Sequence, residues 1–237
     1  MRKIMVLNAK GGCGKSTLAT NLASYYASQG KSVVLADFDR QGSAMEWLEA
    51  RPQDRAPIRG IAAWREPLRV PRATDYVIMD VPAGSHGGDL TALVRRAHTL
   101  IIPVLPSPTD IRAAAQFIHE LLLVGKIVRD ETRLAVVANR VRENSSVQNA
   151  MESVLNSMSI SYSTLNTQIY RNLERFLSRL KIPFVTTLRE SQNYLVADAR
   201  GLGIFDLTRT QTAHDIEQWQ PLLKWLESKR SIPDPAA

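Results

Sequence analysis

Short apolar stretches alternate with longer amphipathic stretches along most of the chain. Six short stretches are rich in Val and Ile and too continuous for half-exposed strands, as is typical of buried parallel strands. They span 3–8, 32–37, 76–81, 99–105, 134–139 and 182–188. Four stretches have helical spacing, at about 15–29, 110–128, 165–181 and 214–229. The alternation predicts an α/β fold, an open, mostly parallel twisted sheet with helices on both faces.

Two segments interrupt this alternation. Residues 51–75 contain four prolines and six arginines, and we expect an irregular surface connection there, with room for one short strand. The Ser- and Asn-rich segment at about 142–164 is predicted to be an exposed excursion, helical at best in 147–158. We therefore expect a single domain over 1–230, followed by a frayed tail at 231–237.

Length and composition are compatible with this fold. With 237 residues, 44% hydrophobic and 22% charged, the chain is long enough to bury a core without disulfide or metal staples. Its only cysteine, Cys13, cannot form an internal disulfide, which suits a reducing compartment. The sequence shows no signal-peptide pattern and no apolar stretch of membrane-spanning length, so we expect a cytoplasmic protein. The net charge of +7 favours a polyanionic partner such as DNA, although many enzymes without one are equally basic.

A glycine-rich loop, KGGCGKS, lies between the first predicted strand and the first predicted helix. This is the context of a phosphate-binding loop. Gly11, Gly12 and Gly14 allow backbone N–H groups to approach phosphates, and the helix offers its positive N-terminal end. Lys15 is placed to contact the β- and γ-phosphates, and the Ser16 hydroxyl to bind Mg²⁺. The alternative is a glycine-rich turn whose lysines are only solvated.

The loop departs from the usual pattern, in which a glycine would stand at Ala9, and it has an additional lysine at position 10. It resembles the K-G-G-x-G-K-[ST] loop of the ParA/MinD family of deviant Walker-A ATPases at every position. In that family the first lysine reaches the nucleotide of a partner subunit, which implies that Lys10 acts in trans. The alternative is an exposed lysine without a role. The resemblance also places Cys13 and Thr17 in the nucleotide-binding loop, with Cys13 as a small filler at a variable position.

The segment 33–44 resembles the second signature of this family, in which a strand ends in D-x-D. Carboxylates at the carboxyl end of a parallel strand lie on the ligand side of the sheet, and alternation points both in the same direction. We therefore expect Asp39 to orient the attacking water and Asp37 to support the lysines of the loop or the Mg²⁺ shell. The family usually has a proline where this chain has Arg40, a departure that bears on surface or partner contacts.

The segment 75–84 resembles the Walker B strand and switch of the family. The resemblance implies that Asp80 holds Mg²⁺ through water and that Gly84 contacts the γ-phosphate. Many family members have a second proline where Ala83 stands. Taken alone, an aspartate that ends an apolar strand is equally well explained as a helix cap.

Two further segments match the family. In 136–141, which resembles the base-recognition strand, the Asn139 amide offers a donor and an acceptor to the edge of adenine, and Arg140 is expected beside it. A strand-end turn residue is the alternative for Asn139. Asp110 belongs to a recurring family segment near a helix start, where a plain N-terminal cap explains it equally well.

The resemblance covers most of 1–207, fails over about 142–164, and is nearest to short ParA-type partition and positioning ATPases. It implies a homodimer that closes around ATP and Mg²⁺, binds DNA without sequence preference and hydrolyses ATP slowly. A ParB-like or cargo-bound partner is expected to stimulate hydrolysis. The expected cargo is a plasmid, a chromosome or a protein body such as a carboxysome, and the expected location is the nucleoid.

A basic stripe is the candidate DNA contact. Arg171, Arg175 and Arg179 recur every four residues, and Lys181 follows at the end of the same predicted helix. The interleaved apolar residues would face the core: Leu173, Phe176, Leu177 and Leu180. We expect the stripe to contact DNA phosphates. A solvated helix face is the alternative.

Two other functions are weighed against this one. A MinD-like membrane ATPase would have a C-terminal amphipathic helix, and an apolar face is present there at Trp219, Leu222, Leu223 and Leu226. Packing of that face onto the sheet is the commoner explanation, so a membrane partner is not expected. A cofactor-insertion ATPase such as the nitrogenase iron protein would need cysteines to hold a cluster, and Cys13 alone cannot do so.

Overall fold

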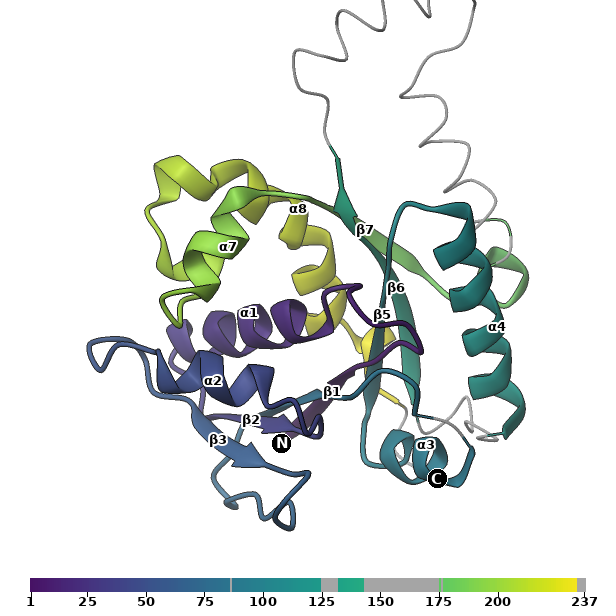
Figure 1. Ribbon diagram of the computed structural model, residues 1–237, viewed down its shortest axis with the longest axis horizontal. Helices are drawn as coiled ribbons and strands as arrows, with labels where there is room; N and C mark the ends of the chain where they lie inside the picture. Colours follow the sequence, from purple (N-terminus) through teal and green to yellow (C-terminus); the bar gives the residue numbers. More distant parts are fainter. Residues whose placement is uncertain (86, 125–131, 143–174, 176, 234–237) are drawn as a thin grey trace, which may run out of the picture.

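Seven parallel strands form one sheet in the order β3-β2-β4-β1-β5-β6-β7 (Figure 1). The computed structural model describes residues 1–85, 87–124, 132–142, 175 and 177–233. The strands are β1 Arg2–Val6, β2 Val33–Asp37, β3 Arg59–Ala62, β4 Tyr76–Asp80, β5 Thr99–Val104, β6 Arg133–Val141 and β7 Phe184–Arg189. Each described pairing is parallel. All six predicted strands are confirmed, and β3 is a short strand within the arginine-rich connection.

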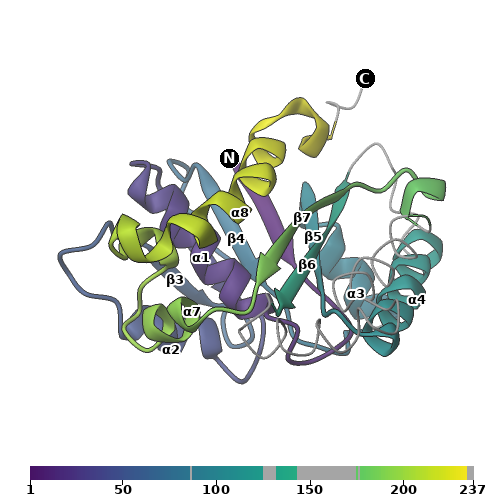
Figure 2. The ribbon, with the colours of Figure 1, turned by 90° about the horizontal axis from the view of Figure 1, so that it is seen from above.

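Helices cover both faces of the sheet (Figures 1 and 2). They are α1 Lys15–Ser28, α2 Ser43–Glu49, α3 Gly87–Val94, α4 Pro108–Val124, α7 Gln192–Asp198 and α8 Arg209–Glu227, with two 3₁₀ turns, η1 Ile204–Asp206 and η2 Lys229–Ser231. Because side chains alternate along a strand, neighbours on β1 enter different cores. Met5 belongs to the same cluster as Phe117 of α4, whereas Ile4 shares a cluster with Leu22 of α1 and Trp219 of α8. The expected two-faced α/β architecture is therefore confirmed.

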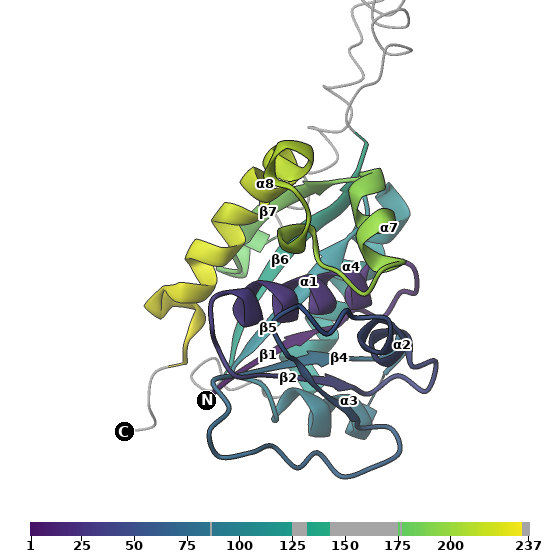
Figure 3. The same cartoon turned by 90° about the vertical axis from the view of Figure 1, so that its left-hand side faces the viewer.

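The strand order places a crevice at the end of β1. This strand lies between β4 and β5, and the chain leaves it towards β2 on one side before it continues from β4 to β5 on the other. Ligands bind outside the carboxyl ends of the strands at such a reversal point. The glycine-rich loop follows β1 directly and begins α1 (Figure 3).

Three helices were not predicted, because α2, α3 and α7 are too short for a helical period to be recognised. They contain seven, eight and seven residues. The longer predicted helices at 15–29, 110–128 and 214–229 correspond to α1, α4 and α8. Of the predicted helix at 165–181, Arg175 and residues 177–179 are described and helical, and the stretch 165–174 lies outside the described residues. Residues 143–164 of the predicted excursion lie outside them too.

The C-terminal helix packs its apolar face into the core. Trp219 and Leu222 are 0% exposed, and Leu223 and Leu226 are 2% exposed. This confirms that the face packs onto the sheet. Within the described ranges, no helix combines the length and the apolar character needed to cross a bilayer.

The chain remains anchored one residue beyond the predicted domain end at 230. Ser231 is fully buried, and Arg2 at the start of β1 donates hydrogen bonds of 2.8 Å to its Oγ and 2.9 Å to its carbonyl oxygen. The two ends of the domain are therefore joined. Residues 234–237 of the predicted frayed tail lie outside the described residues.

Candidate nucleotide-binding site

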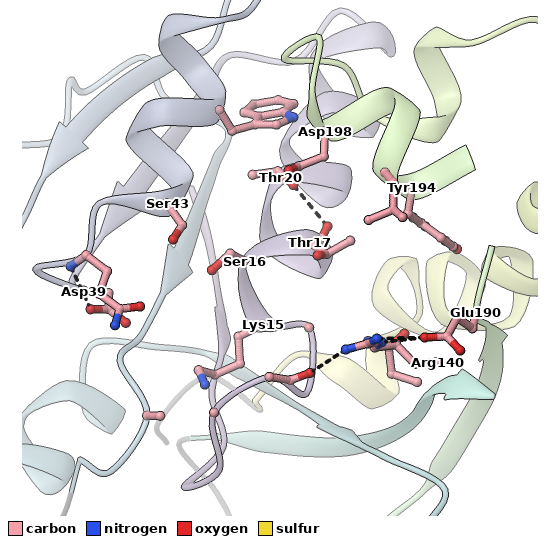
Figure 4. A pocket seen from close by; sticks show the side chains of 18 of the residues that line it. Lys15, Ser16, Thr17, Thr20, Asp39, Ser43, Arg140, Glu190, Tyr194 and Asp198 are labelled. Atoms are coloured by element: carbon pink, nitrogen blue, oxygen red, sulfur yellow. Dashed lines mark hydrogen bonds and ion pairs between the residues drawn. The ribbon is translucent and has the colours of Figure 1, made fainter. Parts of the chain in front are cut away.

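A cavity of about 1070 Å³ opens at the carboxyl edge of the sheet (Figure 4). Five segments line it: the glycine-rich loop with the first turns of α1, the β2–α2 connection with α2, Pro82 and Ala83 after β4, the end of β6, and the β7–α7 segment. Small-molecule pockets have volumes of roughly 300–1,000 Å³. The cavity therefore has room for a nucleoside triphosphate.

The glycine-rich loop leaves the first amides of α1 free to bind an anion. Gly14, with φ 89°, is the N-cap of α1, and no side chain caps the helix. The positive φ of Gly14 disfavours any side chain there. An added Cβ would also lie 2.2 Å from Asn139 Nδ2, so Asn139 would have to shift. Lys15 is 8% exposed, and its Nζ donates to the Lys10 carbonyl oxygen at 3.0 Å. The uncapped N-terminus and the buried ammonium are the groups that can bind a phosphate.

Lys10 does not line this cavity. Its Nζ forms an ion pair with Asp110 Oδ1 at 2.8 Å, and its side chain is 41% exposed. Ser107 is the N-cap of α4, since its Oγ accepts from Asp110 N at 3.1 Å. Burial alone would raise the pKa of Asp110, but hydrogen bonds from Lys10 and Ser107 outweigh it and lower that pKa. Asp110 therefore lies in the first turn of α4 and also pairs with Lys10.

The two aspartates of the D-x-D segment have different surroundings. Asp37 is fully buried, and its carboxylate accepts from Asp39 N at 2.9 Å and Ala44 N at 3.1 Å. It thus fixes the turn that leads into α2. Asp39 lines the cavity, with Oδ1 accepting from Gln41 N at 3.0 Å. Asp39 is therefore the member of the pair that faces a bound ligand.

Asp80 is a buried carboxylate beside the Ser16 hydroxyl and the Lys15 ammonium. It is 1% exposed, and neither of its oxygens has a hydrogen-bond partner among the described residues. Burial raises the pKa of Asp80 to about 7 and the neighbouring Asp37 adds to the shift, although the nearby Ser16 hydroxyl and Lys15 ammonium oppose it. A buried carboxylate at the edge of the sheet, beside the Ser16 hydroxyl and without a well-formed hydrogen bond, fits a hard cation such as Mg²⁺. The switch segment is tied to the loop, because Gly84 N donates to Ala9 O at 3.0 Å.

The end of β6 contacts the glycine-rich loop. Asn139 is 5% exposed, and its Nδ2 donates to Cys13 O at 2.8 Å, which uses one of the two amide hydrogens. Arg140 has a positive φ of 55° and donates from Nη1 to Gly12 O at 3.3 Å. Its Nη2 also lies 2.7 Å from Glu190 Oε1. Asn139, the predicted base-recognition residue, and the neighbouring Arg140 therefore both lie against the loop.

Cys13 is buried, and burial raises the pKa of its thiol. A thiol with a raised pKa is a poor nucleophile and a poor metal ligand. Its Sγ donates to Lys10 O at 3.3 Å. Its surroundings are those expected of a small filler residue.

The predicted DNA-contact residues that the structure describes do not line the cavity. Arg175, Arg179 and Lys181 are exposed, whereas Leu177 is 0% exposed and belongs to the core. Arg171 lies outside the described residues. The described part of this helix thus has the expected polarity.

Several lining residues were not predicted. The β7–α7 segment contributes residues that include Arg189, Glu190, Ser191, Gln192 and Tyr194, and α2 contributes Glu46 and Trp47. Figure 4 shows Glu190 and Tyr194 across α1 from Asp39 and Ser43. The polar run RESQN after an apolar strand was the available signal, because it marks the ligand side of the sheet.

Comparison with known proteins gives the following likenesses. A model of the CobQ/CobB/MinD/ParA nucleotide binding domain matches residues 4–204. The maintenance of carboxysome distribution protein A of Halothiobacillus neapolitanus is 27% identical over 179 residues, which cover 71% of this chain and 82% of that protein. The protein of the same name from Gloeobacter kilaueensis is 34% identical over 134 residues, 52% of this chain and 57% of that protein.

Solved structures of McdA from Cyanothece have the same fold. Apo McdA aligns with a TM-score of 0.70 at 16% identity, over 94% of this chain and 99% of that chain. A variant McdA in complex with ATP aligns with a TM-score of 0.68 at 14% identity, over 100% and 99% of the two chains. At these identities the likeness shows the fold alone.

Proposed function

Because the chain belongs to the CobQ/CobB/MinD/ParA nucleotide-binding domain family, we propose that it is a ParA-type ATPase whose homodimer closes around ATP and Mg²⁺. The dimer binds DNA without sequence preference and positions a cargo, and a cargo-bound partner stimulates hydrolysis. ATP occupies the cavity, with its phosphates on the glycine-rich loop and its base between Asn139 and the β7–α7 segment.

The observation that carries the proposal is the different direction of two lysines on one loop. Lys15 is buried at the start of α1, whereas Lys10 points out of its own cavity and is paired with Asp110. A cation that is partly exposed beside the mouth of the site is available to the nucleotide of a facing subunit. In that position it stabilises charge on the phosphates, as an arginine finger does.

The chain's own residues have distinct tasks in the proposed hydrolysis. The Lys15 ammonium and the first amides of α1 bind the β- and γ-phosphates. The Asp39 carboxylate orients the attacking water by accepting a hydrogen bond from its O–H group. Asp80 and the Ser16 hydroxyl hold Mg²⁺, which neutralises charge on the phosphate oxygens when bound.

DNA binding and cargo positioning are inferred from the charge of the chain and from its relatives. The net charge is +7, and the two relatives described above are named for carboxysome distribution. A protein body such as a carboxysome is therefore the cargo we favour over a plasmid or chromosome, with the nucleoid as the track. The buried apolar face of α8 disfavours the membrane alternative.

Light scattering with size-exclusion chromatography tests the proposal. The wild-type protein should be monomeric with ADP and dimeric with ATP and Mg²⁺. Lys15→Ala should remain monomeric in both conditions, because it lacks the charge that holds the phosphates. A wild-type protein that binds ATP and stays monomeric would exclude the sandwich dimer.

A further inference from the structure

A row of residues on α8 is hydrogen-bonded to the β7–α7 segment, which forms one wall of the cavity. Figure 3 shows α8 running beside β7 and α7. The row comprises Gln211, Asp215, Gln218 and Trp219, which recur with helical spacing and so lie on one face of α8. The segment opposite this row contributes Arg189, Glu190, Ser191, Gln192 and Tyr194 to the cavity.

Asp215 is the centre of this row. It is 0% exposed, and its Oδ1 lies 2.6 Å from Arg189 Nε. Its Oδ2 accepts from Asn193 Nδ2 at 2.5 Å and from Ser191 Oγ at 3.4 Å. Ser191 in turn caps α7 by accepting from Asn193 N at 3.2 Å. One buried carboxylate therefore holds the last residue of β7 and the first turn of α7.

The neighbouring residues on α8 extend the same contact. Gln218 Oε1 accepts from Arg189 N at 2.8 Å, and the Gln211 carbonyl oxygen accepts from Asn193 Nδ2 at 3.0 Å. Trp219 Nε1 donates to the Tyr194 hydroxyl at 2.8 Å. Main-chain and side-chain positions of the segment are thus both fixed by α8.

The Arg189–Asp215 pair, in which the carboxylate is fully buried and the Arg189 side chain is 26% exposed, is not explained by stability alone. Desolvation of two charges offsets much of their attraction, so apolar residues at the same positions often stabilise a protein equally well. Burial alone would raise the pKa of Asp215, but hydrogen bonds from Arg189 and Asn193 outweigh it and lower that pKa. The carboxylate is therefore charged at neutral pH and imposes a fixed geometry on its donors.

We propose that Asp215 is a positioning residue for nucleotide binding, which holds Arg189, Ser191 and Asn193 so that the cavity wall is pre-formed. The inference rests on the proposed function in one respect, namely that ATP binds in this cavity. Since the same contacts join the wall to α8, nucleotide binding and the docking of α8 are thermodynamically linked. By reciprocity, ATP stabilises the docked helix by the same factor by which docking favours ATP.

The chain contains a matched control, the ion pair of Arg51 and Asp206. Arg51 Nη1 lies 2.9 Å from Asp206 Oδ2, and the two side chains are 4% and 6% exposed. Neither residue lines the cavity. Asp206→Asn and Asp215→Asn therefore remove the same charge from two ion pairs, of which only the Arg189–Asp215 pair includes a residue that lines the cavity.

The experiment is a titration of the full-length protein with a fluorescent ATP analogue and Mg²⁺, alongside a thermal melt of each variant. We expect Asp215→Asn to weaken the affinity by about tenfold, within the usual range of coupling between sites, and Asp206→Asn to retain wild-type affinity. Equal affinities of the two variants would overturn the inference. A wild-type protein that binds no ATP would overturn the proposed function and this inference together.

Asn193→Ala keeps the inference testable if Asp215→Asn does not fold. Asn193 does not line the cavity, and its removal leaves the Arg189–Asp215 pair in place. Asn193→Ala can change ATP affinity only by shifting the β7–α7 segment that forms the cavity wall. We therefore expect a several-fold loss of ATP affinity. In the wild-type protein, ATP should also slow amide hydrogen exchange in α8. Unchanged affinity in Asn193→Ala, or unchanged exchange in α8, would contradict the proposed link.

Discussion

At the scale of single residues, Asp80 is the most informative side chain. The raised pKa of Asp80 means that its buried charge costs free energy in the nucleotide-free protein, and such groups persist where a ligand needs them. We expect Asp80→Asn to raise the free energy of unfolding by about 1–2 kcal/mol at pH 8, where the wild-type carboxyl is mostly ionised. The same variant should lose Mg²⁺-dependent ATP turnover. Urea unfolding and a phosphate-release assay measure the two effects.

Asp37 and Asp39 provide the controls for this prediction. Asp37→Asn should lower stability, because Asp37 accepts hydrogen bonds from two backbone amides. Asp39→Ala should leave stability within about 0.5 kcal/mol and should bind ATP and dimerise without turning it over. A fall in stability for Asp80→Asn would mean that its carboxylate is satisfied in solution.

The ion pair between Lys10 and Asp110 predicts a bias towards the monomer. Lys10 must leave Asp110 before it can reach a facing subunit, and exposed pairs contribute up to about 1 kcal/mol. Asp110→Asn should therefore lower the ATP concentration at half-maximal dimerisation by up to about fivefold. Light scattering across an ATP titration measures the shift. Ser107→Ala is the control for the α4 cap, and an equal shift in that variant would assign the effect to the helix start.

At the scale of elements, the helix that ends at Lys181 carries the DNA prediction. Arg175 and Arg179 are exposed on it, and phosphate contacts give affinity that falls steeply with salt. The double variant Arg175→Ala, Arg179→Ala should reduce the salt slope of ATP-dependent DNA binding by about two units, one for each lost contact. ATP binding and dimerisation should be unchanged.

A second double variant with the same loss of charge makes this test specific. Arg69 and Arg72 are exposed in the β3–β4 connection, and their replacement by alanine should leave the salt slope unchanged. A reduced slope for that variant alone would move the DNA surface to the connection.

The elements show which features a sequence reveals. Strands buried on both faces were recognised because β1, β2, β4, β5 and β6 are continuous apolar runs. The helices α2 and α7 were missed, since seven residues hold only two helical turns. Their positions depend on tertiary contacts, such as the hydrogen bond from Trp47 Nε1 to Leu202 O at 3.1 Å.

The candidate site also contains residues that the sequence reveals and contacts that it does not. Gly14, Lys15 and Asp80 were identified because they lie in local motifs at fixed spacing. The contacts of Lys10 with Asp110 and of Arg189 with Asp215 join segments far apart in the chain. No local pattern contains such pairs, so one sequence could not reveal them.

At the scale of the whole molecule, the buried aspartates of two ion pairs, Asp206 and Asp215, predict sensitivity to acid. Burial alone would raise the pKa of Asp206, but hydrogen bonds from Arg51 and Ser24 outweigh it and lower that pKa. A carboxyl with a lowered pKa in the folded state stabilises the protein above its unfolded pKa of about 4, and this stability is lost as pH falls through the folded value. Thermal melts from pH 7 to pH 2 should therefore show a steep acid limb.

Asp206→Asn should be less stable than wild type at pH 7 by about 3–5 kcal/mol, because Arg51 is left buried without its partner. Its acid limb should be flatter, since one proton-linked group is absent. Parallel curves for the two proteins would show that Asp206 does not titrate in this range.

The trans action of Lys10 is tested most directly by mixing two inactive variants, Lys10→Ala and Asp39→Ala. In a mixed dimer, the site on the Lys10→Ala subunit keeps its own Asp39 and receives Lys10 from the other subunit. Half of the dimers are mixed under random association, and each has one complete site, so ATP turnover should recover to about a quarter of wild type. If Lys10 acts within its own subunit, neither site is complete, and turnover of the mixture will stay at the level of the separate variants.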